Sequence, residues 1–309
     1  MKTQFTVRTM LAALVTQLLW ASAFAGIRAG LQAYTPGQLA LLRFLVASLA
    51  LGVYASVVHF RRPEWRDIPA LMISGIVGIT FYNLALNYGE TRVSAGAASL
   101  LIASVPIWTL LIATFTLHER LAPQRWLGVM VSFAGVAVIA SGEGEGIHLS
   151  PQALIILAAA VSSGIYIVHQ KHLLGRYSAL EFTAYSIWSG TLFMVPFGRG
   201  LLHTVKTAPI GATMSIVYLG VFPGAIAYLA WGYVLSHGPA GKSSTLLYLI
   251  PVMAIGIAWI WLGEVPRMIS LAGGGIALGG LGLVNRKERS SPFRPRLGQS
   301  SAPCNEPQP

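Results

Sequence analysis

The sequence predicts an all-α polytopic membrane protein with ten transmembrane helices, arranged as two inverted five-helix repeats. Composition is the first observation, because 54% of the 309 residues are hydrophobic, only 10% are charged and the mean hydropathy is +0.64. Soluble globular domains carry about 25% charged residues, so the chain is not one of them. An internal repeat is the second observation. Residues Val93–Ala137 match Gly238–Gly282 without a gap.

The matched positions of the repeat indicate a duplication. Glu119 and Glu264 carry the most weight, because the chain holds only ten acidic residues and two of them coincide. Pro106 and Pro251 coincide in the same blocks. Further matched pairs are Ala95/Ala240, Gly96/Gly241, Ser99/Ser244, Gly128/Gly273 and Gly135/Gly280.

Ten apolar runs are long enough for the roughly 20 residues that cross a hydrocarbon core of about 30 Å. Each half holds five of them, and an odd number places the second half upside down relative to the first. The runs cover residues 9–29, 36–58, 68–89, 93–117, 123–141, 150–170, 179–198, 209–236, 240–262 and 267–285. The expected domains are a cytoplasmic N-terminus (1–8), the first repeat (9–141), the second repeat (150–285) and a disordered cytoplasmic tail (286–309).

The first run imitates a secretory signal, because Lys2 and Arg8 precede the apolar stretch Leu11–Leu19. Its apolar character continues to Leu31, so we expect an uncleaved helix. With the N-terminus in the cytoplasm, most Lys and Arg residues fall in inside segments, which follows the positive-inside rule. Both termini are therefore expected in the cytoplasm. The net charge of +11 then reflects topology and attraction to anionic lipid, and it does not indicate nucleic acid.

The remaining chemistry of the chain is sparse. The stretch Ser290–Pro309 has five prolines and no apolar periodicity, which predicts disorder. The lone Cys304 lies in it and permits no intramolecular disulfide or cysteine metal site. The sequence contains no H-E-x-x-H, G-x-S-x-G or P-loop motif. We therefore expect no enzyme, no catalytic residue, no metal and no cofactor.

Three features resemble EamA-type members of the drug/metabolite transporter superfamily. The first is the segment Trp20–Arg28, and the second is the segment Leu39–Phe44. The third is the pair of blocks Pro106–Glu119 and Pro251–Glu264, each closing the fourth helix of its repeat. The resemblance covers roughly residues 8–286, and it is specific as to family and poor as to substrate.

The resemblance implies a ten-helix exporter in the bacterial inner membrane. It implies a central cavity near the midplane, lined mainly by helices 1, 3, 4, 6, 8 and 9, and export of amino acids or other small metabolites by alternating access. The expected partners are a small-molecule substrate and membrane lipids, without nucleic acid, and the expected state is a monomer or a homodimer. Two other classes stay open, a non-transporting membrane scaffold or sensor and a membrane-embedded enzyme.

The residues support a cavity independently of that resemblance. Side chains spaced four apart share one face of a helix, as Trp20, Phe24 and Arg28 do. Aromatic groups with a hydroxyl or indole donor suit a small amphipathic solute. The alternatives are interfacial belts or packing for the aromatic residues, and snorkelling to lipid headgroups for Arg28. The predicted substrate-binding set is Trp20, Phe24, Arg28, Tyr82, Ser99, Tyr166, Tyr228, Trp231, Ser244 and Tyr248.

Structural or gating roles are predicted for Arg43, Pro106 and Pro251. A charge as deep as Arg43 needs a partner, and we expect a helix carbonyl or a helix-end acceptor, with substrate contact as the alternative. The prolines lie near the middle of residues 93–117 and 240–262, where each removes a backbone hydrogen bond and bends the helix. They are interpreted as hinges or as bends that shape a cavity, with a harmless kink as the alternative.

The boundary carboxylates are Glu119 and Glu264, expected at opposite membrane faces. They are interpreted as caps or as partners of the nearby Arg125 and Arg267, or else as gate latches. Glu181 is expected at the cytoplasmic boundary, with contact to a cavity as the alternative, and no other acidic group is expected to reach a cavity. The first helix holds no acidic residue between Leu11 and Gly30, so proton antiport through a carboxylate there is not expected.

The fifth and tenth helices are rich in glycine. Gly275 and Gly279 form a small-xxx-small seam that permits close helix approach. The seam is expected to serve packing within the molecule, with a dimer interface as the alternative.

Overall fold

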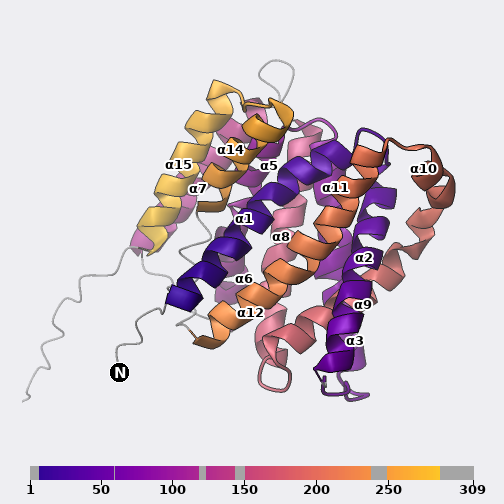
Figure 1. The fold of residues 1–309 in the computed structure, drawn as a ribbon. Helices are drawn as coiled ribbons and strands as arrows, with labels where there is room; N and C mark the ends of the chain where they lie inside the picture. Colours follow the sequence, from indigo (N-terminus) through magenta and orange to yellow (C-terminus); the bar gives the residue numbers. More distant parts are fainter. Residues whose placement is uncertain (1–6, 59, 118–122, 143–149, 238–248, 286–309) are drawn as a thin grey trace, which may run out of the picture.

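Helices build the whole of the described fold, which confirms the predicted all-α class. The structure is a computed structural model, and it describes residues 7–58, 60–117, 123–142, 150–237 and 249–285 (Figure 1). In chain order the elements are α1 (Val7–Gly30), α2 (Pro36–Val57), α3 (Ile68–Ser74), η1 (Gly75–Phe81), α4 (Tyr82–Glu90), α5 (Ala95–Ile102), α6 (Val105–Leu117), α7 (Pro123–Gly142), α8 (Pro151–Leu173), α9 (Ala179–Met194), η2 (Val195–Gly198), α10 (Leu201–Thr207), α11 (Ile210–Val221), η3 (Phe222–Ile226), α12 (Ala227–His237), α14 (Ile250–Leu262) and α15 (Met268–Asn285).

Short polar side chains fix where the long helices begin. Thr35 caps α2 and Ser178 caps α9, each in a capping box with the residue three positions on, Gln38 or Glu181. Ser150 caps α8 by accepting the amide of Ala153. The caps satisfy amides that have no partner inside their own helix, so each helix starts at a defined residue.

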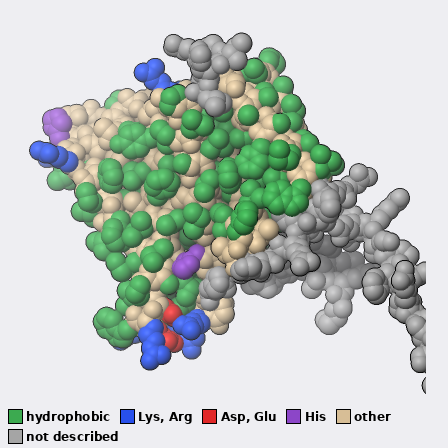
Figure 2. All heavy atoms as spheres, turned by 180° about the vertical axis from the view of Figure 1, so that it is seen from behind, with side chains coloured by type: hydrophobic (Ala, Val, Ile, Leu, Met, Phe, Trp, Pro, Cys, Tyr) green, Lys and Arg blue, Asp and Glu red, His purple; other side chains and the backbone are tan. Residues whose placement is uncertain are grey.

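Six helical stretches within the described residues are long and apolar enough to cross a membrane, and shorter apolar helices accompany them. The six are Val7–Gly30, Pro36–Val57, Ile68–Glu90, Ala95–Thr116, Pro151–Gln170 and Ile210–Trp231. Large apolar side chains such as Leu49, Leu192 and Ile260 are exposed by 63% to 82%. Figure 2 shows hydrophobic side chains spread over one face, with Lys and Arg gathered near its edges. This surface fits lipid, whereas the count of ten spans stays a prediction.

The internal repeat recurs in the backbone conformation. A π-helical turn interrupts the third long helix of the first half at η1 and the corresponding helix of the second half at η3. Val77–Phe81 and Phe222–Ile226 are separated by the same distance along the chain as Glu119 and Glu264. Single π-turns inside α-helices are often found at functional sites.

The two prolines lie at helix starts, so their predicted position in mid-helix is wrong. Pro106 is the second residue of α6, which follows a break after Ile102, and Pro251 is the second residue of α14. Proline is tolerated in a first helical turn, because an amide there has no partner within the helix. The structure therefore divides residues 93–117 into two helices, α5 and α6.

The glycine-rich helices α7 and α15 lie side by side at one edge of the bundle (Figure 1). A side-chain carbon added to Gly128 would lie 2.7 Å from the carbonyl oxygen of Gly280. Only glycine allows this approach, so the glycines of α7 and α15 do serve packing within the molecule. The predicted use of Gly275 and Gly279 for packing within the molecule is wrong, because neither has a neighbour within 4 Å on its side-chain side and both face outward. The alternative of a dimer interface stays a prediction.

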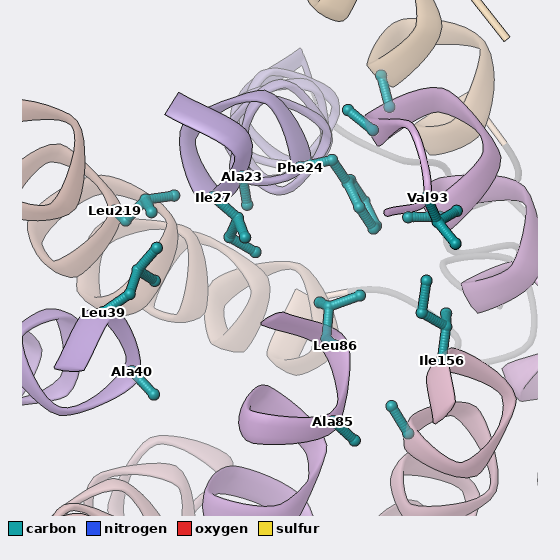
Figure 3. Close-up of a cluster of buried hydrophobic side chains, with 14 of the residues drawn as sticks. Ala23, Phe24, Ile27, Leu39, Ala40, Ala85, Leu86, Val93, Ile156 and Leu219 are labelled. Atoms are coloured by element: carbon teal, nitrogen blue, oxygen red, sulfur yellow. The ribbon is translucent and has the colours of Figure 1, made fainter. Parts of the chain in front are cut away.

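Both halves contribute to the central core. Ala23, Phe24 and Ile27 of α1 point toward Leu86 of α4 and toward side chains of α2 and α11 (Figure 3). This core places α1 and α4 at the centre, next to the helices of the second repeat.

Candidate functional site

An aromatic cluster joins the two halves of the molecule. Trp20 of α1 lies 5.4 Å from Tyr228 and 5.7 Å from Trp231, both on α12, measured between ring centroids. All three side chains are half-buried. They provide apolar ring faces together with hydroxyl and indole donors, which is the chemistry that binds small amphipathic molecules.

Tyr166 lies on α8, within electrostatic reach of Tyr228. Its ring lies directly against the α-carbon of Gly78, where a larger residue would exclude it, and 5.4 Å from the ring of Phe182. Tyr82, at the start of α4, packs against the central core and remains half-buried. The π-turn η1 directly precedes Tyr82, and its Gly78 leaves room for the ring of Tyr166.

Arg43 lies buried beside these aromatic residues. Its Nη1 donates to Oδ1 of Asn83 at 3.3 Å, and its guanidinium lies 5.2 Å from the ring centroid of Phe44. Its predicted partner, a helix carbonyl or helix end, is therefore wrong, because the partner is a side-chain amide on α4. Tyr82 and Tyr228 lie within electrostatic reach of the guanidinium. Its Nε has no hydrogen-bond partner among the described residues.

Arg28 and Glu264 form an ion pair at one end of the bundle. Nε and Nη2 of Arg28 donate to Oε1 of Glu264 at 2.9 and 2.8 Å, and Nη1 donates to the backbone carbonyl of Glu90 at 2.7 Å. Oε2 of Glu264 accepts the amide of Ala95, the first residue of α5, at 3.3 Å. The pair thus ties α1 to α4, to α5 and to the segment after α14. We call it the rim pair.

The rim pair corrects two expectations. Arg28 binds protein in this structure and does not extend toward lipid headgroups. Glu264 pairs with Arg28, whereas the neighbouring Arg267 donates to the carbonyl of Gly142. The predicted pairing of Glu264 with Arg267 is therefore wrong, whereas its capping role agrees with the hydrogen bond that Oε2 of Glu264 accepts from the amide of Ala95 at the start of α5. A cavity of about 200 Å³ adjoins the rim pair and is lined by Arg28, Leu31, Gln32, Thr91, Leu262 and Glu264.

Glu90 is a buried acidic residue that the sequence analysis did not identify. It is the last residue of α4, is 0% exposed, and neither carboxylate oxygen has a hydrogen-bond partner among the described residues. The expectation that no acidic group except Glu181 reaches a cavity is wrong, because Glu264 lines the cavity beside the rim pair, whereas Glu181 closes the capping box of α9. Asn83, Asn87 and Glu90 recur at helical spacing on one face of α4, and this pattern was the available signal.

The other predicted residues divide into two groups. Phe24 is 5% exposed and belongs to the core, and the buried hydroxyl of Ser99 donates to the carbonyl of Gly96 within α5. Ser244, Tyr248 and Glu119 lie outside the described residues, as do Cys304 and the predicted tail. A binding role for any residue of the predicted set stays a prediction.

Comparisons with known proteins agree with the internal repeat. The EamA-like transporter family matches residues 7–141 and again residues 150–286. "Uncharacterized transporter YdfC" of Bacillus subtilis is 43% identical, over 85% of this chain and 86% of that protein. "Probable terminal-alkyne amino-acid exporter" of Streptantibioticus cattleyicolor is 41% identical, over 92% and 97%.

Two more distant similarities complete the comparison. "Probable amino-acid metabolite efflux pump" of Escherichia coli is 25% identical, over 82% of this chain and 86% of that protein. A solved crystal structure is 21% identical with a TM-score of 0.59, over 89% of this chain and 95% of that one, and it supports the fold alone.

Proposed function

We propose that this chain, which belongs to the EamA-like transporter family, exports small amphipathic metabolites such as amino acids by alternating access. Two relatives that match most of the chain are named as an amino-acid exporter and an amino-acid metabolite efflux pump. The chain is an integral membrane transporter, and its location in the bacterial inner membrane, as a monomer or a homodimer, is part of the proposal. No catalytic step is included.

The observation that carries the proposal is the aromatic and cationic cluster between the two repeats. Trp20 and Tyr82 come from the first repeat, whereas Tyr228 and Trp231 come from the second, and the buried Arg43 lies beside them. Indole and phenol rings would pack on an apolar side chain, and the guanidinium would bind the carboxylate of an amino acid. A site between two repeats is also where alternating-access carriers bind their substrates.

The proposed topology has ten helices in two inverted repeats, residues 9–141 and 150–285, with both termini in the cytoplasm. Glu119 then faces the cytoplasm and Glu264 the outside. Single cysteines at these positions in a Cys304→Ser background would be labelled with a membrane-impermeant reagent. Labelling of both positions from the same side would exclude the inverted arrangement.

The rim pair is proposed to close the outer end of the cavity. It links α1 of the first repeat to the segment after α14 in the second, so it must separate if the two repeats move apart there. Both side chains are partly exposed, and partly exposed ion pairs contribute about 1 kcal/mol or less. A contact this weak is suited to a gate that opens in every cycle.

Flux from reconstituted vesicles tests the proposed function. The purified full chain would be reconstituted with labelled amino acids, nucleosides and cationic drugs, and efflux would be compared with that of protein-free vesicles. We expect saturable efflux of amphipathic amino acids. Trp231→Ala is the matched variant, and Trp259→Ala, whose ring is 64% exposed, is the control. Absence of flux for the whole panel would contradict the proposal.

A further inference from the structure

The buried carboxyl of Glu90 is the feature that the proposed function leaves unused. Both oxygens are inaccessible, and neither accepts a hydrogen bond from the described residues. An ionised carboxylate is an acceptor only, with about four lone-pair sites to satisfy, and burying it without donors is very unfavourable. An ionisable group inside a membrane bundle therefore indicates a function by default.

None of the neighbouring donors among the described residues makes a hydrogen bond to the carboxyl of Glu90. Arg28 contacts the backbone carbonyl of Glu90, and its other nitrogens bind Glu264. Arg43 directs Nη1 to Asn83. The side-chain nitrogen of Asn87, one turn before Glu90, donates to the carbonyl of Pro36. A protonated carboxyl fits these surroundings better than a carboxylate does, because it carries no charge to compensate.

The groups around Glu90 decide which ligand it binds. Arg28 on α1, Arg43 on α2 and Glu264 after α14 are the charged groups within electrostatic reach. Tyr82 and Tyr88 lie on α4 itself, and α8 brings Ile156 and the backbone of Gln152 against the end of α4.

Two nearby guanidinium groups would repel a metal ion or a substrate ammonium group. The described residues also contain no group of three or more side chains able to hold a metal. A proton needs no space and leaves the carboxyl neutral. The two guanidinium groups oppose a proton as well, but the cost of burying an unpaired carboxylate outweighs that repulsion, so a proton is the cation that this position accommodates.

We propose that Glu90 carries a proton while the rim pair is closed and releases it when the rim pair opens. Opening of the rim pair frees Nε and Nη2 of Arg28 from Glu264. Nη1 of Arg28 already donates to the backbone carbonyl of Glu90, so the freed guanidinium can also bind the Glu90 carboxylate. The O–H bond of the carboxyl breaks, its proton passes to water at the opened end, and closing reverses the transfer. The inference rests on the proposed gate, and it couples proton binding to access at that end.

Accessibility of a buried cysteine tests this coupling without any substrate. Val93, buried just after α4, would be replaced by cysteine in a Cys304→Ser background and labelled with an impermeant thiol reagent from about pH 5 to about pH 9. The labelling rate at each pH would be divided by the labelling rate of the same chain carrying Glu90→Gln. This division cancels the pH dependence that comes from ionisation of the thiol itself. Glutamine resembles the protonated carboxyl in shape and charge, so that chain should stay closed.

We expect the ratio of the two labelling rates to be near one at low pH. It should rise by up to about tenfold per pH unit once Glu90 ionises. Glu264→Gln, which weakens the rim pair directly, should raise labelling at every pH. A ratio that stays flat over the whole range would overturn the proposal.

Efflux from vesicles containing the wild-type chain gives a second test that needs no variant. We expect its rate to rise as the pH is raised on the side of the rim pair, because the proton of Glu90 leaves at that end, and efflux that ignores this pH would overturn the coupling. The two proposals also fail differently. Absence of any flux together with pH-dependent labelling would remove the exporter and retain the proton site.

Discussion

Two carboxylates near the same end of the bundle have opposite surroundings. Glu264 is partly exposed, binds two nitrogens of Arg28 through Oε1 and accepts the amide of Ala95 through Oε2. Glu90 is fully buried and accepts no hydrogen bond from the described residues. The ion pair of Glu264 holds helices together, and breaking it costs little free energy. The buried carboxylate of Glu90 is unfavourable unless a ligand or a proton neutralises its charge.

The two arginines show the same contrast. Arg28 uses Nε, Nη1 and Nη2 on acceptors at the rim. Among the described residues, the buried Arg43 uses Nη1 in a hydrogen bond to Asn83, and its Nε has no partner. Groups at the rim are therefore suited to gating, and buried groups to binding. The following variants test this difference, in order of decreasing expected effect.

Arg43→Gln should have the largest effect. It removes a buried charge and disturbs the hydrogen bond to Asn83, so we expect flux to fall by at least about tenfold and stability to fall by about 1–3 kcal/mol. Flux in vesicles and thermal unfolding in detergent would measure both. Arg92→Gln is the control, because Arg92 is exposed. Equal flux in the two variants would remove Arg43 from the binding site.

Tyr166→Ala and Trp231→Ala should each reduce flux by about tenfold, the loss expected when a ring contact of 1–2 kcal/mol with substrate is removed. Both variants should remain monodisperse after extraction in detergent, as judged by size-exclusion chromatography. Wild-type flux in both would assign these rings to packing or to the lipid-facing surface.

Pro106→Ala and Pro251→Ala should reduce turnover by a few-fold and leave ligand affinity nearly unchanged. Each ring lies in the first turn of its helix, and α5 and α6 are separated just before Pro106. Alanine allows a continuous helix, which would bias the carrier toward one facing state. Flux in both directions and ligand binding would be measured for each variant. Unchanged turnover in both would show that the breaks only shape the bundle.

Glu264→Gln should have the smallest effect on stability, about 1 kcal/mol or less, because the rim pair is partly exposed. It should nevertheless increase labelling of cysteines beneath the rim. A variant as destabilised as Arg43→Gln would contradict the distinction between the rim and the buried groups.

Composition and spacing sufficed for much of the fold. The apolar runs predicted the long helices, and the match of Glu119 to Glu264 predicted two repeats, which agree with the paired π-turns and the family match. The break before Pro106 was missed because a proline in the middle of an apolar run predicts a kink as readily as a new helix. The glycine seam was misplaced because spacing along α15 does not reveal which face meets α7.

The candidate site was harder to predict because its contacts join distant parts of the chain. Arg28 and Glu264 are 236 positions apart, and no local pattern relates them. Glu90 was overlooked because it ends an apolar run, where an acidic residue usually marks the membrane boundary. Packing of α4 against α8, α2 and α1 buries it.

The central claim is that the rim pair closes one end of the carrier and must open for transport. Arg28→Cys and Glu264→Cys would be combined in a Cys304→Ser background, bridged by a short bifunctional thiol reagent and assayed for flux. We expect the bridge to stop flux, because the repeats can no longer separate while joined, and we expect cleavage of the bridge with a reductant to restore flux. Flux that continues at the unbridged rate with the bridge fully formed would contradict it.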